Sequence, residues 1–197
     1  LEFTIERGTL YMLQTRTAKR SARAALRIAV DMVREGLISQ SDAIRRISPS
    51  QLDELLRPVF DREARKKSHS LARGLPAGPG AATGRIAFSA DRAEELSRSG
   101  PVILVRPETN PDDIHGMAAA AGILTQTGGL TSHAAVVGRG MGKVCVVGCE
   151  AVDISEARGT LKLNGRTLKE NDELSLDGFT GDVIDGRPVR KVKGGLM

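Results

Sequence analysis

The chain has 197 residues, of which 40% are hydrophobic, and it carries a formal net charge of +5. This length allows one ordinary hydrophobic core with a smaller appended unit. The lack of tryptophan and an aromatic content of 3% argue against a stacking platform for nucleic acid, and no apolar run is long enough to cross a bilayer.

The basic residues are unevenly distributed. Residues 1–75 carry 15 Lys and Arg against 9 Asp and Glu, whereas residues 76–197 carry 14 against 15. Because charges of both signs are interspersed on the helix expected at residues 61–67, we interpret the excess as a solvated helical face or as part of a nucleotide-phosphate site. With no signal-peptide pattern at its start, the chain is expected in the cytoplasm, without membrane or nucleic-acid partners.

A β-hairpin and three helices are predicted first. Residues 1–16 alternate around a turn at Arg7-Gly8, as paired strands do. Residues 18–35 repeat apolar side chains at i, i+3 and i+4 spacing, which predicts an amphipathic helix. Two more helices follow, one capped by Ser39 or Ser41 and one opened by Ser48-Pro49.

A domain boundary is predicted at residues 75–84, where a Pro/Gly run breaks any helix. Beyond it, short strands and helices alternate, which is typical of a mixed α/β domain with a mostly β periphery. Asn164-Gly165 between two apolar segments is a strong hairpin signal. The predicted strands cover residues 85–88, 102–105, 123–126, 144–147, 161–163, 166–168, 173–176 and 182–184, and the predicted helices cover residues 90–97, 112–121 and 132–139.

One histidine lies at a junction that suits an anion. His133 follows a glycine pair and opens a small-residue helix, where free N–H groups and the helix dipole favour an anion and disfavour imidazolium. Thr131 and Ser132 can cap the helix or hydrogen-bond the ring, and Gly128 and Gly129 let backbone amides point at phosphate oxygens. This pattern indicates a nucleophilic histidine that carries a phosphoryl group. The alternative is a structural histidine that follows a glycine turn, is buried, and forms its hydrogen bonds within the protein.

The wider motif favours the first interpretation. Together with residues 138–148, which end the helix in three glycines and restart a strand, it resembles the phosphohistidine domain of enzymes that use or make phosphoenolpyruvate. That family includes phosphoenolpyruvate synthase, enzyme I of the sugar phosphotransferase system and the pyruvate phosphate dikinases. The dikinase motif, GGMTSHAAVVARGMGK, is the most similar, and the chain departs from it at Leu130 and Gly138. The resemblance implies a three-layer β/β/α swivelling fold.

The hairpin points to the same family. It resembles the last two strands of the dikinase ATP-grasp domain. The resemblance implies that Glu2 binds Mg²⁺ and that Gln14 and Arg16 face the phosphates of ATP, and these are side-chain types that a metal and a triphosphate need. Taken alone, the hairpin is an ordinary amphipathic pair of strands.

The loop at residues 106–113, which follows a predicted strand and leads into a predicted helix, also resembles a sequence of this family. Asn110 or Asp112 can simply cap the next helix. The loop is similar to the family sequence RPETSPEDI, which lies near the phosphohistidine face. This resemblance implies supporting roles for Arg106, Glu108 and Thr109.

The chain departs from the family at Thr127. The family commonly reads LTARGGMTSH, so an arginine is replaced by a neutral hydroxyl at this position. We therefore expect backbone amides and groups from partner domains to neutralise more of the phosphoryl charge.

The other histidines and the cysteines are weaker candidates. Cys145 and Cys149 have no second pair nearby, so zinc binding is not expected and Cys145 is expected to be buried in a strand. His69 is expected to be an exposed bystander, and the neighbours of His115 suggest packing.

These observations predict the central part of a pyruvate phosphate dikinase. The expected segments are an ATP-grasp hairpin at 1–17, a helical linker at 18–74, the swivelling domain at 75–186 and a linker at 187–197. The resemblance implies that His133 relays a phosphoryl group, with ATP, phosphate and pyruvate giving AMP, pyrophosphate and phosphoenolpyruvate. It also implies Mg²⁺ as cofactor and a regulatory phosphate on Thr131.

The chain begins without Met, so a segment of a longer polypeptide is expected. By itself the segment is expected to be monomeric and inactive, while the parent enzyme is expected to be a homodimer. Phosphoenolpyruvate synthase, which uses water in place of phosphate, and a non-catalytic module of the same fold are the alternatives.

Overall fold

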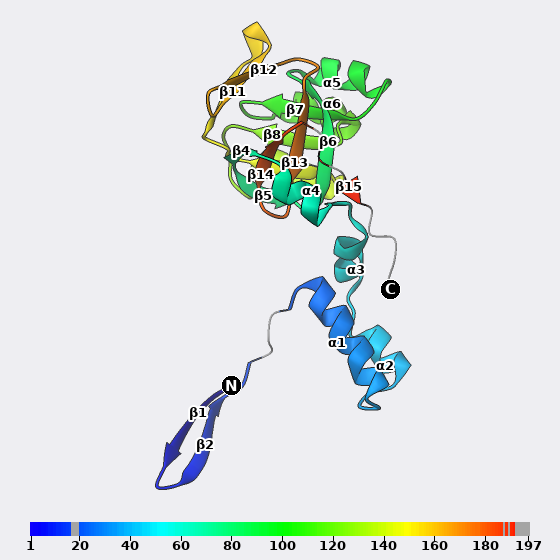
Figure 1. The fold of residues 1–197 in the computed structure, drawn as a ribbon, viewed down its shortest axis with the longest axis vertical. Coiled ribbons are helices and arrows are strands. Elements are labelled where there is room, and N and C mark those ends of the chain that lie inside the picture. Colours follow the sequence, from blue (N-terminus) through cyan, green and yellow to red (C-terminus); the bar gives the residue numbers. More distant parts are fainter. Residues whose placement is uncertain (17–19, 187, 189, 192–197) are drawn as a thin grey trace. The chain divides into compact units, whose positions relative to one another are not determined.

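A computed structural model of the chain describes residues 1–16, 20–186, 188 and 190–191. The chain divides into two compact units, Leu1–Leu55 and Leu56–Met197, which are described separately (Figure 1). No helix in the described part of the chain is long and apolar enough to cross a membrane.

The first unit opens with the predicted hairpin. Strands β1 (Glu2–Glu6) and β2 (Thr9–Gln14) pair antiparallel across a turn at Arg7 and Gly8. Both turn residues have positive φ, +50° and +78°, as a type I′ turn requires. The hairpin prediction is confirmed.

Three helices follow in the same stretch: α1 (Ala22–Arg34), α2 (Gln40–Arg45) and α3 (Pro49–Leu56). The first begins after its cap residue Ser21, later than predicted, and residues 18 and 19 of the prediction lie outside the described residues. Ser39, rather than Ser41, caps α2, because its hydroxyl accepts from the Asp42 N–H while the Asp42 carboxylate accepts from the Ser39 N–H.

The second unit is built on an eight-stranded sheet in the order β4-β14-β13-β6-β7-β8-β9-β5. The four strands from β6 to β9 run parallel, and the strands at both sides of them are antiparallel to their neighbours. The strands are β4 (Ser70–Arg73), β5 (Leu75–Gly78), β6 (Ala81–Ala87), β7 (Val102–Arg106), β8 (Gly122–Thr125), β9 (Val144–Val147), β13 (Glu173–Asp177) and β14 (Asp182–Asp185).

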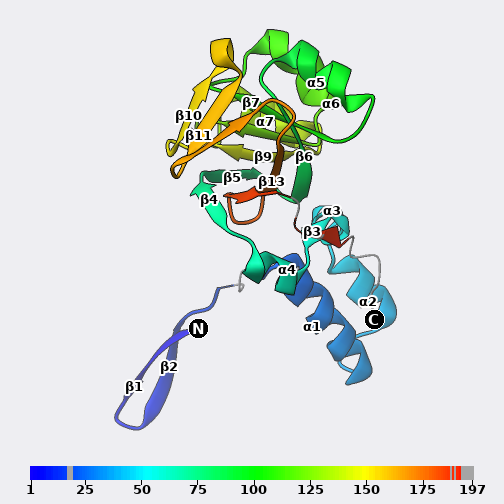
Figure 2. The ribbon, with the colours of Figure 1, turned by 45° about the horizontal axis from the view of Figure 1, so that its top comes forward.

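Different layers cover the two faces of this sheet (Figure 2). Successive side chains of β7 point to opposite faces of the sheet. Ile103 and Val105 pack in one buried cluster, and Val102 and Leu104 pack in the other. The first cluster includes the antiparallel sheet of β10 (Val152–Ser155), β11 (Thr160–Leu163) and β12 (Arg166–Lys169). The second includes residues of α5 (Ala90–Ser97), α6 (Ile114–Ala119) and α7 (His133–Gly140). The mixed α/β prediction is confirmed.

Several predicted elements need adjustment. The turn between β11 and β12 has positive φ at both Asn164 and Gly165, as expected for a type I′ hairpin. The helix predicted at 112–121 is instead a 3-10 turn at Pro111–Asp113 followed by α6. A second 3-10 turn, Glu156–Arg158, follows β10, a strand that was not predicted.

The Pro/Gly run at residues 75–84 is part of the sheet and not a break between domains. Pro76 lies in β5, at the edge of the sheet, where a residue without an N–H is tolerated. At Gly78 a Cβ atom would lie 2.3 Å from the Lys143 carbonyl oxygen, so the strand approaches its neighbour more closely than a side chain would allow.

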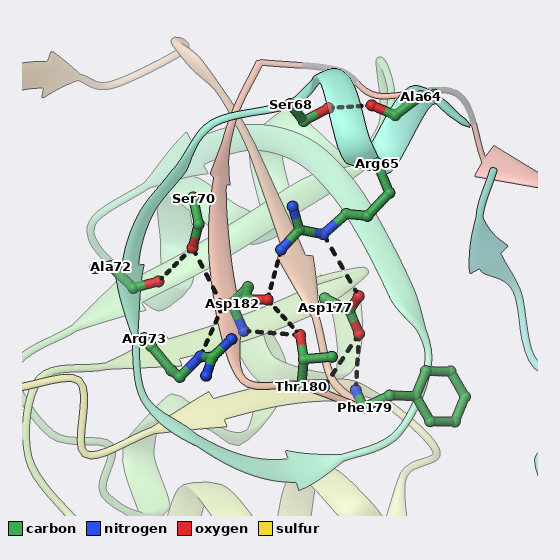
Figure 3. Close-up of polar contacts among 10 residues, drawn as sticks. All are labelled: Ala64, Arg65, Ser68, Ser70, Ala72, Arg73, Asp177, Phe179, Thr180 and Asp182. Atoms are coloured by element: carbon green, nitrogen blue, oxygen red, sulfur yellow. Dashed lines mark hydrogen bonds and ion pairs between the residues drawn. The ribbon is translucent and has the colours of Figure 1, made fainter. Parts of the chain in front are cut away.

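A polar cluster fastens the segment before this run to the sheet (Figure 3). Asp182, buried at the start of β14, accepts from Arg65 Nη2 at 2.5 Å and from Arg73 Nε at 2.8 Å. Arg65 lies in α4 (Arg62–Lys67) and Arg73 in β4. Ser70 and Thr180 donate hydroxyl hydrogen bonds to the same carboxylate. The compact unit therefore begins at residue 56 instead of the predicted residue 75.

The strand that enters this unit pairs with a strand near the end of the chain. β3 (Val59–Phe60) and β15 (Arg190–Lys191) are antiparallel, and Phe60 packs with Ala81 and Ile184. Most of the linker predicted at 187–197 lies outside the described residues.

Candidate functional site

The candidate site lies at the carboxyl ends of three parallel strands. The loops that follow β7, β8 and β9 are joined by backbone hydrogen bonds, from Thr127 N to Pro107 O at 3.0 Å and from Gly148 N to Thr127 O at 3.3 Å. Loops at this edge of a parallel sheet carry the ligand sites of many α/β folds. The bonds fix the loop after β8, which leads to His133.

His133 is the first residue of α7 and is half-buried. Ser132 caps the helix with a hydroxyl that accepts from the Ala135 N–H at 3.4 Å. Ala134 and Ala135 are buried against the sheet, so the helix is anchored on the side away from solvent. The predicted placement of His133 at a capped helix start is confirmed.

The two glycines before the Thr-Ser-His sequence have different structural roles. Gly128 has φ +100°, and a Cβ there would come within 2.9 Å of the Ser132 Cβ. A side chain at 128 would therefore strain the backbone and push the helix cap aside. Gly129 faces open space, since a Cβ at this position would meet no atom within 4 Å.

The histidine ring is hydrogen-bonded to the loop after β7. Thr109 Oγ1 lies 3.2 Å from His133 Nδ1, and Thr109 is only 3% exposed. Asn110 caps the following 3-10 turn, so the capping interpretation and the supporting role of this loop are compatible. Thr131 is exposed, and the described structure gives it no hydrogen bond to the ring. Sequence proximity therefore pointed to Thr131, whereas the contact comes from 24 residues away.

Arg106 connects several segments around the site. Its guanidinium forms ion pairs with Glu156 at 2.6 Å and Asp113 at 3.4 Å and donates to the Phe88 carbonyl. Its buried Nε has no partner among the described residues. Because its charge is already shared with two carboxylates, Arg106 is placed to hold the loops together. The side chain of Glu108 is exposed.

Thr127, at the position of the family arginine, has a structural contact of its own. Its hydroxyl donates to the Pro107 carbonyl at 3.0 Å, which adds to the bond from the Thr127 backbone N–H to the same carbonyl. A different cation reaches the histidine loop: Arg139 Nη2 donates to the Leu130 carbonyl at 2.9 Å.

The remaining titratable candidates are not suited to the chemistry. Cys145 and Cys149 are both buried, as predicted for Cys145, and burial raises the pKa of their thiols to about 12 and about 11. Neither thiol is therefore ionised near neutral pH. His69 is exposed, as predicted. His115 is also exposed and contacts Asp91 at 3.0 Å, so it is not packed by its neighbours.

The hairpin brings two of its three predicted ligands together. Glu2 and Gln14 are direct cross-strand partners, and Arg16 lies two residues beyond the end of β2. All three are exposed. The described residues contain no group of three or more His, Cys, Asp or Glu that could hold a metal. Mg²⁺ usually keeps water and substrate phosphates among its ligands, so one carboxylate and one amide fit a contributing role only.

Comparison with known proteins identifies the class of this site. Residues 99–181 match the family model described as PEP-utilising enzyme, mobile domain. This span contains the loops after β7, β8 and β9 and all of α7. The match over these residues confirms the resemblance found in the sequence.

The similar proteins are pyruvate, phosphate dikinases. The chain is 54% identical over 187 residues to the one from Rhizobium meliloti and 53% identical over 187 residues to the one from Clostridium symbiosum. It is 50% identical over 188 residues to pyruvate, phosphate dikinase 2 of Zea mays. These matches cover 94%, 94% and 95% of the chain but 21% of each relative, so the chain spans about a fifth of their length.

Proposed function

We propose that His133 is the phosphoryl carrier of a pyruvate, phosphate dikinase and that this chain supplies the carrier part of that enzyme. The observation that supports this most directly is the ring geometry. Thr109 Oγ1 lies within hydrogen-bond distance of Nδ1, and the ring is half-buried at the start of a capped helix. With Nδ1–H donating to the Thr109 hydroxyl oxygen, the unprotonated nitrogen is Nε2, and the adjacent helix N–H groups favour a phosphoryl group there.

The proposed reaction has three transfers. In the first, Nε2 forms a bond to the β-phosphorus of ATP, the bond from that phosphorus to the AMP oxygen breaks, and AMP leaves. In the second, an oxygen of inorganic phosphate attacks the γ-phosphorus, the bond from that phosphorus to the bridging oxygen breaks, and pyrophosphate leaves with the β-phosphoryl group still on Nε2. In the third, the enolate oxygen of pyruvate attacks this phosphorus, and the P–N bond breaks to give phosphoenolpyruvate and neutral His133. Imidazole serves the first and third steps because it is a competent nucleophile and a good leaving group.

The finer assignments are part of this proposal. A swivelling β/β/α domain fits the layers around the eight-stranded sheet, and an ATP-grasp hairpin fits the exposed, separate strands β1 and β2. Glu2 and Gln14 would contribute to a Mg²⁺ site, and Arg16 would contact phosphate. A bound Mg²⁺ would screen the phosphate charges. The assembled enzyme would be a cytoplasmic homodimer.

Regulation at Thr131 also belongs to the proposal. Thr131 is exposed and lies two residues before His133. A phosphate on its hydroxyl would add up to two negative charges beside the nucleophile and would repel an incoming phosphoryl donor.

A chimera tests the proposed carrier. The matching segment of the Clostridium symbiosum dikinase, which is 53% identical, is replaced by this chain. We expect the chimera to take up label from ³²P-phosphoenolpyruvate in the presence of Mg²⁺, with the acid-labile, base-stable label mapped to His133. A folded chimera, verified by circular dichroism and by gel filtration, that takes up no label on His133 would overturn the proposal.

Loss of the Thr109 hydroxyl is expected to slow phosphoryl transfer. Thr109→Val removes the hydrogen bond that selects the ring tautomer, and one such bond is worth about 1 kcal/mol, so label uptake by the chimera should slow by roughly fivefold to tenfold. ³¹P NMR should also show some phosphate on Nδ1. Thr167→Val, on an exposed strand position, is the matched control. Equal rates for the two variants would contradict the role of Thr109.

A further inference from the structure

One basic side chain reaches the histidine loop from the other end of its helix. Arg139 lies in the last turn of α7, yet its Nη2 donates to the carbonyl of Leu130, three residues before His133. The bond length of 2.9 Å is that of a well-formed hydrogen bond. The guanidinium is therefore held beside the loop that presents the histidine.

This guanidinium has unused binding capacity. An arginine carries five N–H donors, and the described structure gives Arg139 a single acceptor. No carboxylate in the described part of the chain forms an ion pair with it. Its side chain is exposed, so an incoming group can reach it.

The other positively charged side chains described near the site already have hydrogen-bond or ion-pair partners. Arg106 is paired with Glu156 and Asp113, and Lys143 donates to the Ala118 carbonyl. Thr127 is neutral and bonded to Pro107. A phosphoryl group on His133 would bring about two negative charges to this loop, to which Arg139 is already hydrogen-bonded.

We propose that Arg139 binds the phosphoryl group on His133 and supplies the positive charge that Thr127 lacks. The inference rests on the proposed function of His133 as carrier. In the unphosphorylated protein the guanidinium holds the Leu130 carbonyl. In the phosphorylated protein its remaining N–H groups donate to phosphoryl oxygens, as a planar fork suits.

The test uses the 197-residue chain and potassium phosphoramidate as phosphoryl donor. His133 Nε2 forms a bond to the phosphorus, the P–N bond of phosphoramidate breaks, and ammonia leaves with a proton. The second ionisation of the phosphoryl group is then followed by ³¹P NMR as a function of pH. An adjacent cation favours the dianion, so Arg139→Met should raise the phosphoryl pKa by about one unit, and Arg139→Lys should retain most of the effect.

The matched control is Arg98→Met, at an exposed arginine on the end of α5 whose nearest carboxylate is 4.0 Å away. It should leave the phosphoryl titration unchanged. If Arg139→Met titrates like Arg98→Met, the role of Arg139 is wrong while the carrier role stands. If the wild-type chain takes up no phosphoryl group on His133, the proposed function itself fails.

Discussion

Replacing His133 by Asn is expected to abolish phosphoryl transfer in the chimera in both directions. The exchange of ATP with AMP and the exchange of pyruvate with phosphoenolpyruvate would both pass through a group bound to Nε2, pyrophosphoryl in the first and phosphoryl in the second, so loss of the ring removes both together. Asn cannot act as a nucleophile in its place. Isotope exchange measured separately for each half-reaction should fall to background, by roughly a thousandfold or more on the scale of lost covalent catalysis.

The fold should survive this change, because the ring is half-buried and its one hydrogen bond among the described residues is to Thr109. His69→Asn, at an exposed histidine of the same unit, serves as control and should retain full exchange. Retention of either partial exchange by the His133 variant would show that the carrier lies elsewhere.

Asp182→Ala is expected to destabilise the second unit by about 3 kcal/mol, since it leaves Arg65 and Arg73 without the buried carboxylate that joins them. Helix α4 should lose the Arg65 hydrogen bond to β14, while β4 keeps its backbone pairing with that strand, and the melting temperature should fall by roughly 10 °C. Urea denaturation at pH 7, with Asp153→Ala at an exposed strand position as control, measures the difference. A loss under about 1 kcal/mol would mean that the cluster is not a stabilising contact.

The same carboxylate predicts a dependence on pH. Burial acts to raise the pKa of Asp182, but hydrogen bonds from Arg73, Thr180 and Arg65 outweigh it and hold the pKa well below its usual value. A carboxyl group whose pKa is lower in the folded state than in the unfolded state stabilises the fold at pH values above its unfolded-state pKa of about 4. This stabilisation is lost as the pH falls below that value toward the folded-state pKa. Wild type should therefore lose more stability than Asp182→Asn between about pH 5 and pH 2.

Local sequence patterns were sufficient for much of the second unit. The helix predicted at 90–97 and the strand at 144–147 have the predicted bounds, because each has a clear apolar period and its own start signal. β5 was missed because its Pro and Gly residues usually break strands. Only its place at the sheet edge, a property of the whole fold, makes them acceptable.

The candidate site also has one part that was predictable from the local sequence and another that was not. The capped helix start at His133 follows from adjacent residues, so it was predictable. The hydrogen bond between Thr109 and His133 and the contact of Arg139 with Leu130 depend on how loops from different strands meet. The sequence pattern assigned Thr109 only a supporting role through family resemblance, and it gave no signal for Arg139.

The pairing of β3 with β15 has a consequence for how this unit can be joined to other proteins. Because residues 59–60 and 190–191 are hydrogen-bonded neighbours, the points where the chain enters and leaves the unit lie side by side. A unit whose two ends are adjacent can be inserted into a loop of a host protein without separating the host's flanking residues. We therefore expect residues 59–191 to tolerate such an insertion, and joining their ends with a short linker should permit circular permutation at an exposed turn such as Asn164-Gly165.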